Sequence, residues 1–191
     1  MDTRTALLDS AERAARQRGF DAFSYADLSK DVGIRKASIH YHFPMKADLA
    51  FGLIERYARR FSETLANIDT TQMTAADKLH AYHKIYRDAL SGGDQVCLCV
   101  ALSAGRDSLT EPVLDQLNQF HQDSVAWLQQ VFETSRLDGS INHTGDPAAE
   151  AAATLALMEG AQLVARAAKD ITLFDQATAT LLARLAPTTT H

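Results

Sequence analysis

The chain has 191 residues, 46% apolar and 23% charged, which suits one large or two smaller domains with a packed core. Its formal net charge of −5 argues against nucleic-acid binding by the surface as a whole. The charge is uneven, however: residues 1–60 carry 11 Lys/Arg and 8 Asp/Glu, whereas residues 61–191 carry 8 and 16. A basic N-terminal segment is compatible with local contacts to phosphate.

The sequence contains no pattern typical of export or membrane insertion. A basic segment followed by an apolar run is missing at the start, and Glu150, Glu159 and Arg166 interrupt the most apolar stretch, residues 148–168. We therefore expect a cytoplasmic protein with no membrane partner. Cys97 and Cys99 stand two positions apart, which argues against a disulfide framework.

Helical periodicity predominates and predicts an all-α fold of about nine helices. A first helix carries an apolar stripe from Leu7 to Ala15 and ends at Gly19. Ser24 is the expected N-cap of a short helix to about Val32. A second short helix follows over 36–42, and Pro44 precedes a long helix over about 46–67.

The second half continues the helical pattern. Thr74 is the expected cap of a fifth helix, which stops before Gly92-Gly93, and a short sixth helix covers about 95–105. A seventh helix runs from about 111 to 136, and residues 138–146 form a loop. An eighth helix extends from Pro147 to about Lys169, and a ninth runs from Thr172 to before Pro187. The predicted domains are residues 1–46 and 47–191.

The two short helices and the glycine between them have the geometry of a helix-turn-helix. In that motif the second helix enters the major groove of DNA, and its N-terminal side chains reach the base edges. Leu28, Val32, Ile34 and Ile39 are spaced to pack the pair against the first helix. A short helix pair with a glycine turn is by itself a common pattern without this function.

A longer match, over 31 residues, makes the helix-turn-helix interpretation more specific. GFDAFSYADLSKDVGIRKASIHYHFPMKADL, Gly19 to Leu49, resembles the signature of the tetracycline-repressor (TetR) family in its Gly-Phe pair, its Gly33-Ile34 turn, Lys36, its Tyr-His-Phe ending and its Lys46-x-x-Leu49 start of the fourth helix. The resemblance implies a three-helix DNA-binding domain followed by a C-terminal ligand-binding and dimerisation domain. It further implies a transcription regulator, by the family's default a repressor, with neither enzymatic activity nor a cofactor.

The resemblance also implies which residues contact DNA. Those nearest the bases would be Lys36, Ala37, Ser38 and His40, and those holding phosphates Tyr41, His42 and Lys46, with Arg35 flanking the groove. The chain departs from the family at Arg35, where Ser or Thr often caps the helix, and at His40, where Tyr is frequent. Both positions bear on the base preference. Alternatively, His42 is a packed core histidine, Tyr41 covers the first helix, and Lys36 and Lys46 are solvated charges.

The last two predicted helices are apolar on more than one face. Small residues such as Ala152, Ala156 and Gly160 permit close approach, so a homodimer through these helices is the expected solution, although burial within one chain is an alternative. A two-fold dimer predicts a palindromic operator in double-stranded DNA. The resemblance also implies an effector cavity in the C-terminal domain. The residues expected to line it are Tyr57, Phe61, His83, Tyr86, Cys97, Trp127 and Leu128.

The segment Val96-Cys97-Leu98-Cys99 is distinctive. A helix N-terminus raises the thiolate fraction of a cysteine, which favours Cys97 over Cys99 as a reactive thiol. The chain resembles a branch of the family with Cys-Leu at the start of the sixth helix, some of whose members respond to electrophiles. The alternatives are two inert buried thiols, a thiol hydrolase using Cys97 with His83 or His121, and a metal sensor using both cysteines and a histidine. We expect no catalytic residue and no bound metal, because no nucleophile elbow or complete zinc pattern accompanies the cysteines.

Overall fold

The computed structural model describes residues 2–142 and 145–185. Within these ranges the fold is all-α, as expected: it contains nine α-helices and no strand, apart from one isolated antiparallel bridge between Ile141 and Leu185. Part of the predicted loop over 138–146, residues 143–144, lies outside the described residues, and so does Pro187, before which the ninth helix was expected to end.

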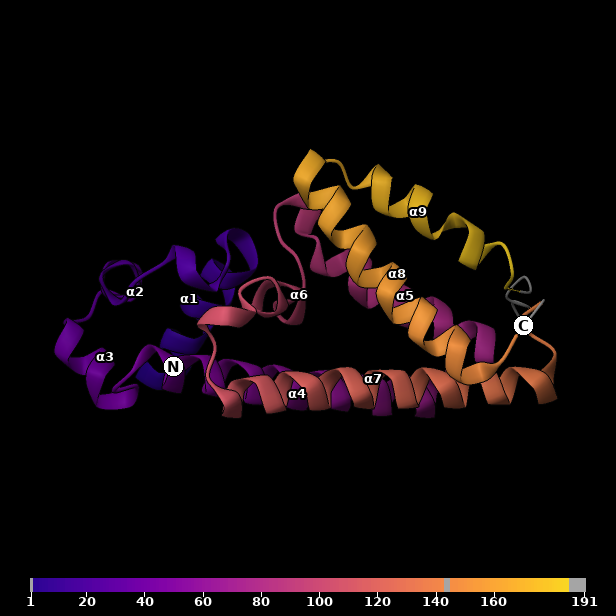
Figure 1. The fold of residues 1–191 in the computed structure, drawn as a ribbon, viewed down its shortest axis with the longest axis horizontal. Coiled ribbons are helices and arrows are strands. Elements are labelled where there is room, and N and C mark those ends of the chain that lie inside the picture. The colour runs from indigo at the N-terminus through magenta and orange to yellow at the C-terminus, as the bar shows by residue number, and fades with distance from the viewer. Residues whose placement is uncertain (1, 143–144, 186–191) are drawn as a thin grey trace. The chain divides into compact units, whose positions relative to one another are not determined.

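The helices follow the predicted order (Figure 1). They are α1 (Thr3–Arg18), α2 (Tyr25–Val32), α3 (Lys36–His42), α4 (Lys46–Thr71), α5 (Ala75–Ala89), α6 (Leu98–Ser103), α7 (Glu111–Asp138), α8 (Pro147–Ala168) and α9 (Thr172–Leu182). Helix α4 extends four residues beyond its predicted end. Helix α6 begins three residues later than predicted, because the backbone of Val96 pairs with Arg16 of α1 instead of starting a helical turn.

Side-chain caps fix several helix starts. Ser24 and Asp27 form a reciprocal capping box at α2, and Thr74 and Asp146 accept from the backbone N–H groups of Asp77 and Ala149 at α5 and α8. These bonds satisfy N–H groups that have no partner inside the helix. The predicted caps at Ser24 and Thr74 are therefore confirmed.

The chain divides into two compact units. Unit 1 comprises residues 1–60 and 95–119, and unit 2 comprises residues 61–94 and 120–191. Helices α4 and α7 each continue from one unit into the other. The predicted boundary at residue 46 follows the DNA-binding motif alone and stays a prediction.

Unit 1 is built around α1, which packs on α2 and α6. Its core contains Leu7, Leu8, Leu28 and Ile39, whereas Val32 and Ile34 are only half-buried. In unit 2, α5 lies beside α8, and α8 lies beside α9 (Figure 1). Among the described residues, no helix is both long and apolar enough to cross a membrane.

Candidate functional site

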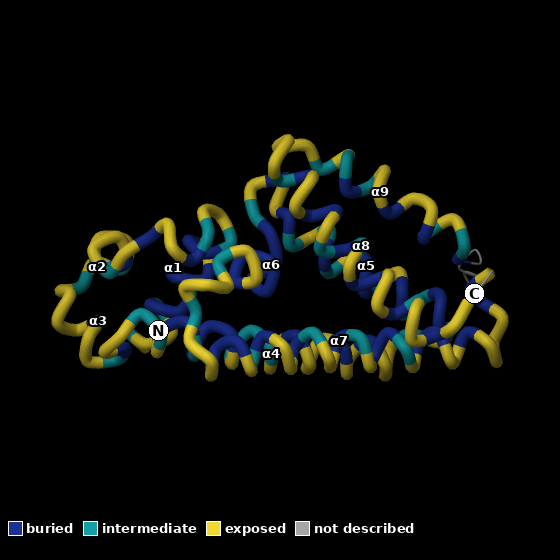
Figure 2. The backbone as a smooth tube through the Cα atoms, in the orientation of Figure 1, coloured by how far each residue is buried: buried dark blue, intermediate teal, exposed yellow. Residues whose placement is uncertain are grey.

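Helix α3 has one buried residue, and most of its other residues are exposed, as the colours of Figure 2 show. Ile39 is fully buried and anchors the helix to the core of unit 1. The exposed residues are Arg35, Lys36, Ala37, Ser38, His40 and Tyr41. This pattern leaves a mostly polar helix surface open to a ligand as large as DNA.

The two aromatic candidates at the end of α3 differ in exposure. Tyr41 is 83% exposed, so the alternative that it covers α1 is wrong. His42 is half-buried, and its ring meets the ring of Tyr41 edge-on at 5.1 Å, so it is not a packed core histidine. Both line a shallow groove of about 420 Å³ with Thr3, Ile34, Ala37 and Ser38. Their contact with phosphates stays a prediction.

The three basic candidates also differ. Lys36 is exposed in the first turn of α3, and Arg35 is the N-cap residue of that helix but makes no side-chain cap. The Lys46 ammonium instead donates to the Phe23 carbonyl at 2.8 Å and lies 4.8 Å from the ring centres of Phe20 and Phe23. Burial lowers its pKa. Lys46 therefore already has an intramolecular role, and a phosphate contact at this residue stays a prediction.

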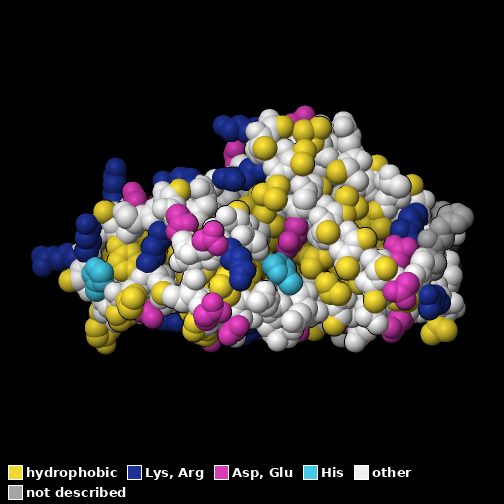
Figure 3. All heavy atoms as spheres, in the orientation of Figure 1, with side chains coloured by type: hydrophobic (Ala, Val, Ile, Leu, Met, Phe, Trp, Pro, Cys, Tyr) yellow, Lys and Arg dark blue, Asp and Glu magenta, His cyan; other side chains and the backbone are white. Residues whose placement is uncertain are grey.

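Basic side chains are visible around this part of the molecule. In Figure 3, Lys and Arg side chains project from the surface over α1, α2 and α3, at the left of the view. This placement agrees with the excess of Lys/Arg over Asp/Glu in residues 1–60. Positive charge at this surface favours association with a polyanion.

Cys97 lies in the same unit as the helix-turn-helix. It is the N-cap residue of α6, its sulfur accepts from the Val100 N–H at 3.5 Å, and its side chain is buried. The hydroxyl of Tyr57 from α4 is hydrogen-bonded to Cys97, and burial raises the pKa of Tyr57 well above its ordinary value. The structure thus brings together two of the predicted effector-site residues, Tyr57 and Cys97.

The segment before α6 is tied to α1. The Arg16 guanidinium donates to the Val96 carbonyl at 2.9 Å, and the Val96 N–H donates to the Arg16 carbonyl at 3.2 Å. Sequence reasoning did not identify Arg16, because a bond between residues 80 positions apart leaves no local pattern. This pair of bonds connects the cysteine segment directly to α1, the helix that packs on α2.

Three other predicted effector residues belong to an aromatic cluster in unit 2. Phe61 contacts Tyr86 and Phe120 with ring centres 6.3 and 4.9 Å apart, and Trp127 stacks on Tyr82 at 5.5 Å. The Trp127 indole N–H donates to Asp69 at 2.9 Å. The rings therefore fill one another's space in this structure, and a ligand among them would have to displace or separate rings.

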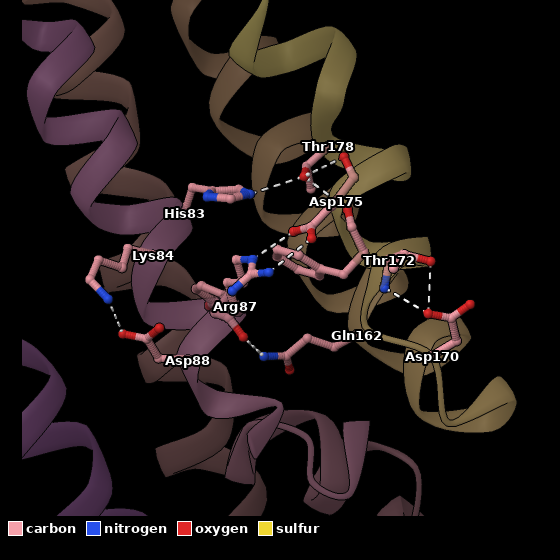
Figure 4. A network of polar contacts seen from close by, with 11 residues as sticks. His83, Lys84, Arg87, Asp88, Gln162, Asp170, Thr172, Asp175 and Thr178 are labelled. Carbon is pink, nitrogen blue, oxygen red and sulfur yellow. Dashed lines mark hydrogen bonds and ion pairs between the residues drawn. The ribbon is translucent and has the colours of Figure 1, made fainter. Parts of the chain in front are cut away.

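His83 faces α9 and belongs to a polar network (Figure 4). Its Nε2 lies 3.0 Å from the Thr178 hydroxyl, which itself donates to the Phe174 carbonyl, so Nε2 is the donor. Arg87 makes a bidentate ion pair with Asp175 at 2.6 and 2.9 Å. Burial lowers the pKa of His83. These bonds fix α5 against α9 and give His83 a structural role.

The enzyme and metal alternatives gain no support. His83 is engaged with Thr178, and His121 Nε2 lies 3.2 Å from a Glu159 carboxylate oxygen without forming a hydrogen bond to it. Within the described ranges, no group of three or more His, Cys, Asp or Glu side chains is arranged to hold a metal ion.

Comparison with known proteins decides the family. Residues 7–53 match the family model of bacterial regulatory proteins, tetR family, and residues 75–181 match that of the tetracyclin repressor-like C-terminal domain. This chain belongs to the TetR family. TetR-family proteins are transcriptional regulators rather than enzymes.

Similar TetR-family proteins match over nearly the whole chain. The transcriptional repressor NemR of Escherichia coli is 26% identical over 93% of this chain and 91% of its own. A TetR-family regulator from Agrobacterium tumefaciens is 30% identical, with a TM-score of 0.89 over 96% of this chain and 97% of the other. The reduced form of E. coli NemR gives a TM-score of 0.84 at 26% identity, with all of both chains covered.

Proposed function

We propose that the protein is a cytoplasmic homodimeric repressor that leaves a palindromic operator when an effector acts on its C-terminal part. The observation that carries the proposal is an exposed, polar α3 in a chain whose two halves both match the TetR family. Lys36, Ala37, Ser38 and His40 are assigned to the bases, and Arg35, Tyr41 and His42 to the flanking backbone. A repressor is favoured by the similarity to NemR.

An exposed apolar face of α8 supports the homodimer. Leu163 and Val164 are 46% and 56% exposed, and a Cβ on Gly160 would meet nothing within 4 Å. The other exposed small residues on this face are Ala152, Ala153, Ala156 and Ala167. Their spacing of three and four positions places them along one side of the helix, where a second copy packs closely.

We assign the sensor role to Cys97. Its sulfur accepts from the Val100 N–H and is hydrogen-bonded to the Tyr57 hydroxyl, so two donors lie at the sulfur. Donors of this kind stabilise a thiolate once it has formed. An α,β-unsaturated aldehyde fits this chemistry: the thiolate adds to the β-carbon, a C–S bond forms, and the resulting enolate takes a proton from water. The adduct would not fit the buried site, so α6 would shift and displace Val96 from Arg16 of the DNA-binding head.

The test begins with selection of operator DNA from a random duplex pool by the full chain. We expect an enriched palindrome, and a pool without an enriched sequence would contradict the DNA-binding assignment. A gel shift with that palindrome is then repeated after treatment with an unsaturated aldehyde. Loss of the shift in the wild type and in Cys99→Ser, but not in Cys97→Ser, is expected. A shift that survives treatment would refute the thiol sensor and leave a reversible ligand of unit 2 as the effector.

A further inference from the structure

Two side chains stabilise the turn between α3 and α4, because they lie within hydrogen-bonding distance of three successive carbonyl oxygens. The Tyr25 hydroxyl lies 2.8 Å from both the Phe43 and the Met45 carbonyls, and its one hydrogen is shared between them. His40 Nδ1 lies 3.2 Å from the Pro44 carbonyl between them. The rings of Tyr25 and His40 also meet edge-on at 5.0 Å. His40 is therefore held in one orientation although it is exposed.

This arrangement fixes which ring nitrogen of His40 carries the hydrogen. A carbonyl oxygen can only accept, so Nδ1 must donate to Pro44. In the neutral imidazole the other nitrogen, Nε2, then presents a lone pair and can only accept. No described residue makes a hydrogen bond to Nε2, so this acceptor remains available to a ligand.

His40 lies on the face of α3 that the DNA-binding assignment turns toward the bases. Lys36 and Ala37 precede it by four and three positions, so the three side chains share one exposed face. In the major groove the only hydrogen-bond donors are the exocyclic amino groups, N6 of adenine and N4 of cytosine. Guanine N7 and O6, thymine O4 and the phosphate oxygens are acceptors, which a neutral Nε2 cannot bind.

We propose that His40 is a specificity-determining residue whose Nε2 accepts a hydrogen bond from an exocyclic amino group of adenine or cytosine in the major groove. The inference rests on the proposed binding of operator DNA by α3. Tyr25 is a positioning residue: its hydroxyl holds the turn that supplies the Pro44 acceptor, and its ring supports the imidazole. The frequent Tyr of the family at this position carries a hydroxyl that both donates and accepts and therefore does not make the same selection.

The first experiment compares operator selection by the wild type, His40→Phe and Tyr25→Phe. His40→Phe keeps an aromatic ring against Tyr25 but has no nitrogen. We expect the wild type to select adenine or cytosine at one position of each half-site, and His40→Phe to lose the preference there alone. Tyr25→Phe should weaken the preference at that same position, whereas a purely structural role would weaken binding to all sequences equally. Lys36→Ala serves as a comparison on the same face: because Lys36 is also assigned to the bases, it should weaken binding and change the preference at another position of the half-site, but not at the position read by His40.

The second experiment uses only the wild-type protein for its main readout, so it does not depend on the folding of a variant. The selected adenine is replaced by purine, or the selected cytosine by 2-pyrimidinone, each of which lacks the amino group. We expect about a tenfold loss of affinity for the wild type, as for one specific base contact. His40→Phe should bind both duplexes equally. The analogue that lowers the affinity identifies the contacted base as adenine or as cytosine.

The outcomes separate the two proposals. If the wild type enriches no sequence, the DNA-binding function itself fails. If the wild type enriches an operator but His40→Phe enriches the same base at every position, the function stands and the role of His40 is wrong. An unchanged affinity for the amino-deleted duplex, or a uniform loss with His40→Phe that indicates a phosphate contact, would equally overturn it.

Discussion

The buried carboxylate of Glu12 offers a direct test of how the DNA-binding head is fixed to α4. Glu12 lies in α1 with its side chain 8% exposed, and it accepts from the Arg56 guanidinium at 2.7 Å. Arg60 and Arg16 lie at 3.3 and 3.7 Å. Arg56 also pairs with Asp9 at 2.7 Å, but the Asp9 side chain is 43% exposed. The two carboxylates therefore share one cation and differ in burial.

The substitution Glu12→Gln keeps the shape and removes the charge. A buried hydrogen bond to a charged group contributes about 1.5–3 kcal/mol, and Gln retains one neutral acceptor for Arg56. The contact to the 54% exposed Arg60 adds little because water screens it, and Arg16, at 3.7 Å, is too distant for a hydrogen bond. We expect the free energy of unfolding to fall by about 2 kcal/mol. The control Asp9→Asn should cost about 0.2–1 kcal/mol, as for an exposed pair.

Urea unfolding followed by helical circular dichroism measures both variants. Wild type, Glu12→Gln and Asp9→Asn are compared at one protomer concentration, because the proposed dimerisation would contribute to the measured stability. A drop in the midpoint at unchanged slope reports lost stability. Equal midpoints for the two variants, or a Glu12→Gln midpoint within error of the wild type, would show that burial does not set the strength of this contact.

Three further predictions concern the other sites. Lys46→Met should lower the free energy of unfolding by about 1–2 kcal/mol, because it removes a hydrogen bond and two cation–π contacts. Lys36→Ala should leave the free energy of unfolding unchanged. Equal effects of the two substitutions in urea titrations would contradict this prediction. Burial lowers the pKa of His83, so as the pH falls the unfolded chain takes up a proton before the folded chain does. The free energy of unfolding should therefore decline as the pH falls below about 6.5. His83→Gln should flatten that part of the pH profile, and an unchanged profile would contradict this prediction. Tyr57→Phe should slow the alkylation of Cys97 by roughly tenfold, which corresponds to about 1.4 kcal/mol for a hydrogen bond to a charged group. Mass spectrometry measures the rate of alkylation. An equal rate in the variant and the wild type would exclude Tyr57 as the hydrogen-bond donor to the thiolate.

The sequence by itself determined most of the helices, the motif and the family. Caps at Ser24 and Thr74, the glycine at position 33 and the period of the apolar residues are local signals, and local signals set helix starts and exposed faces. The short helices at 25–32 and 36–42 were therefore predicted at their observed bounds. The order of residues in the motif sufficed for the resemblance to the TetR family.

Tertiary structure decided which groups meet, because contacts between distant residues depend on how helices pack and leave no periodic trace in the sequence. In the folded chain His83 is hydrogen-bonded to Thr178, the Lys46 ammonium donates to the Phe23 carbonyl, and Arg16 donates to the Val96 carbonyl. It also placed Tyr25 against His40, so that a turn carbonyl selects the tautomer of an exposed histidine. The resemblance to the family predicts that His40 faces DNA, but only the packing of α2 against the turn after α3 fixed which hydrogen-bonding group it presents.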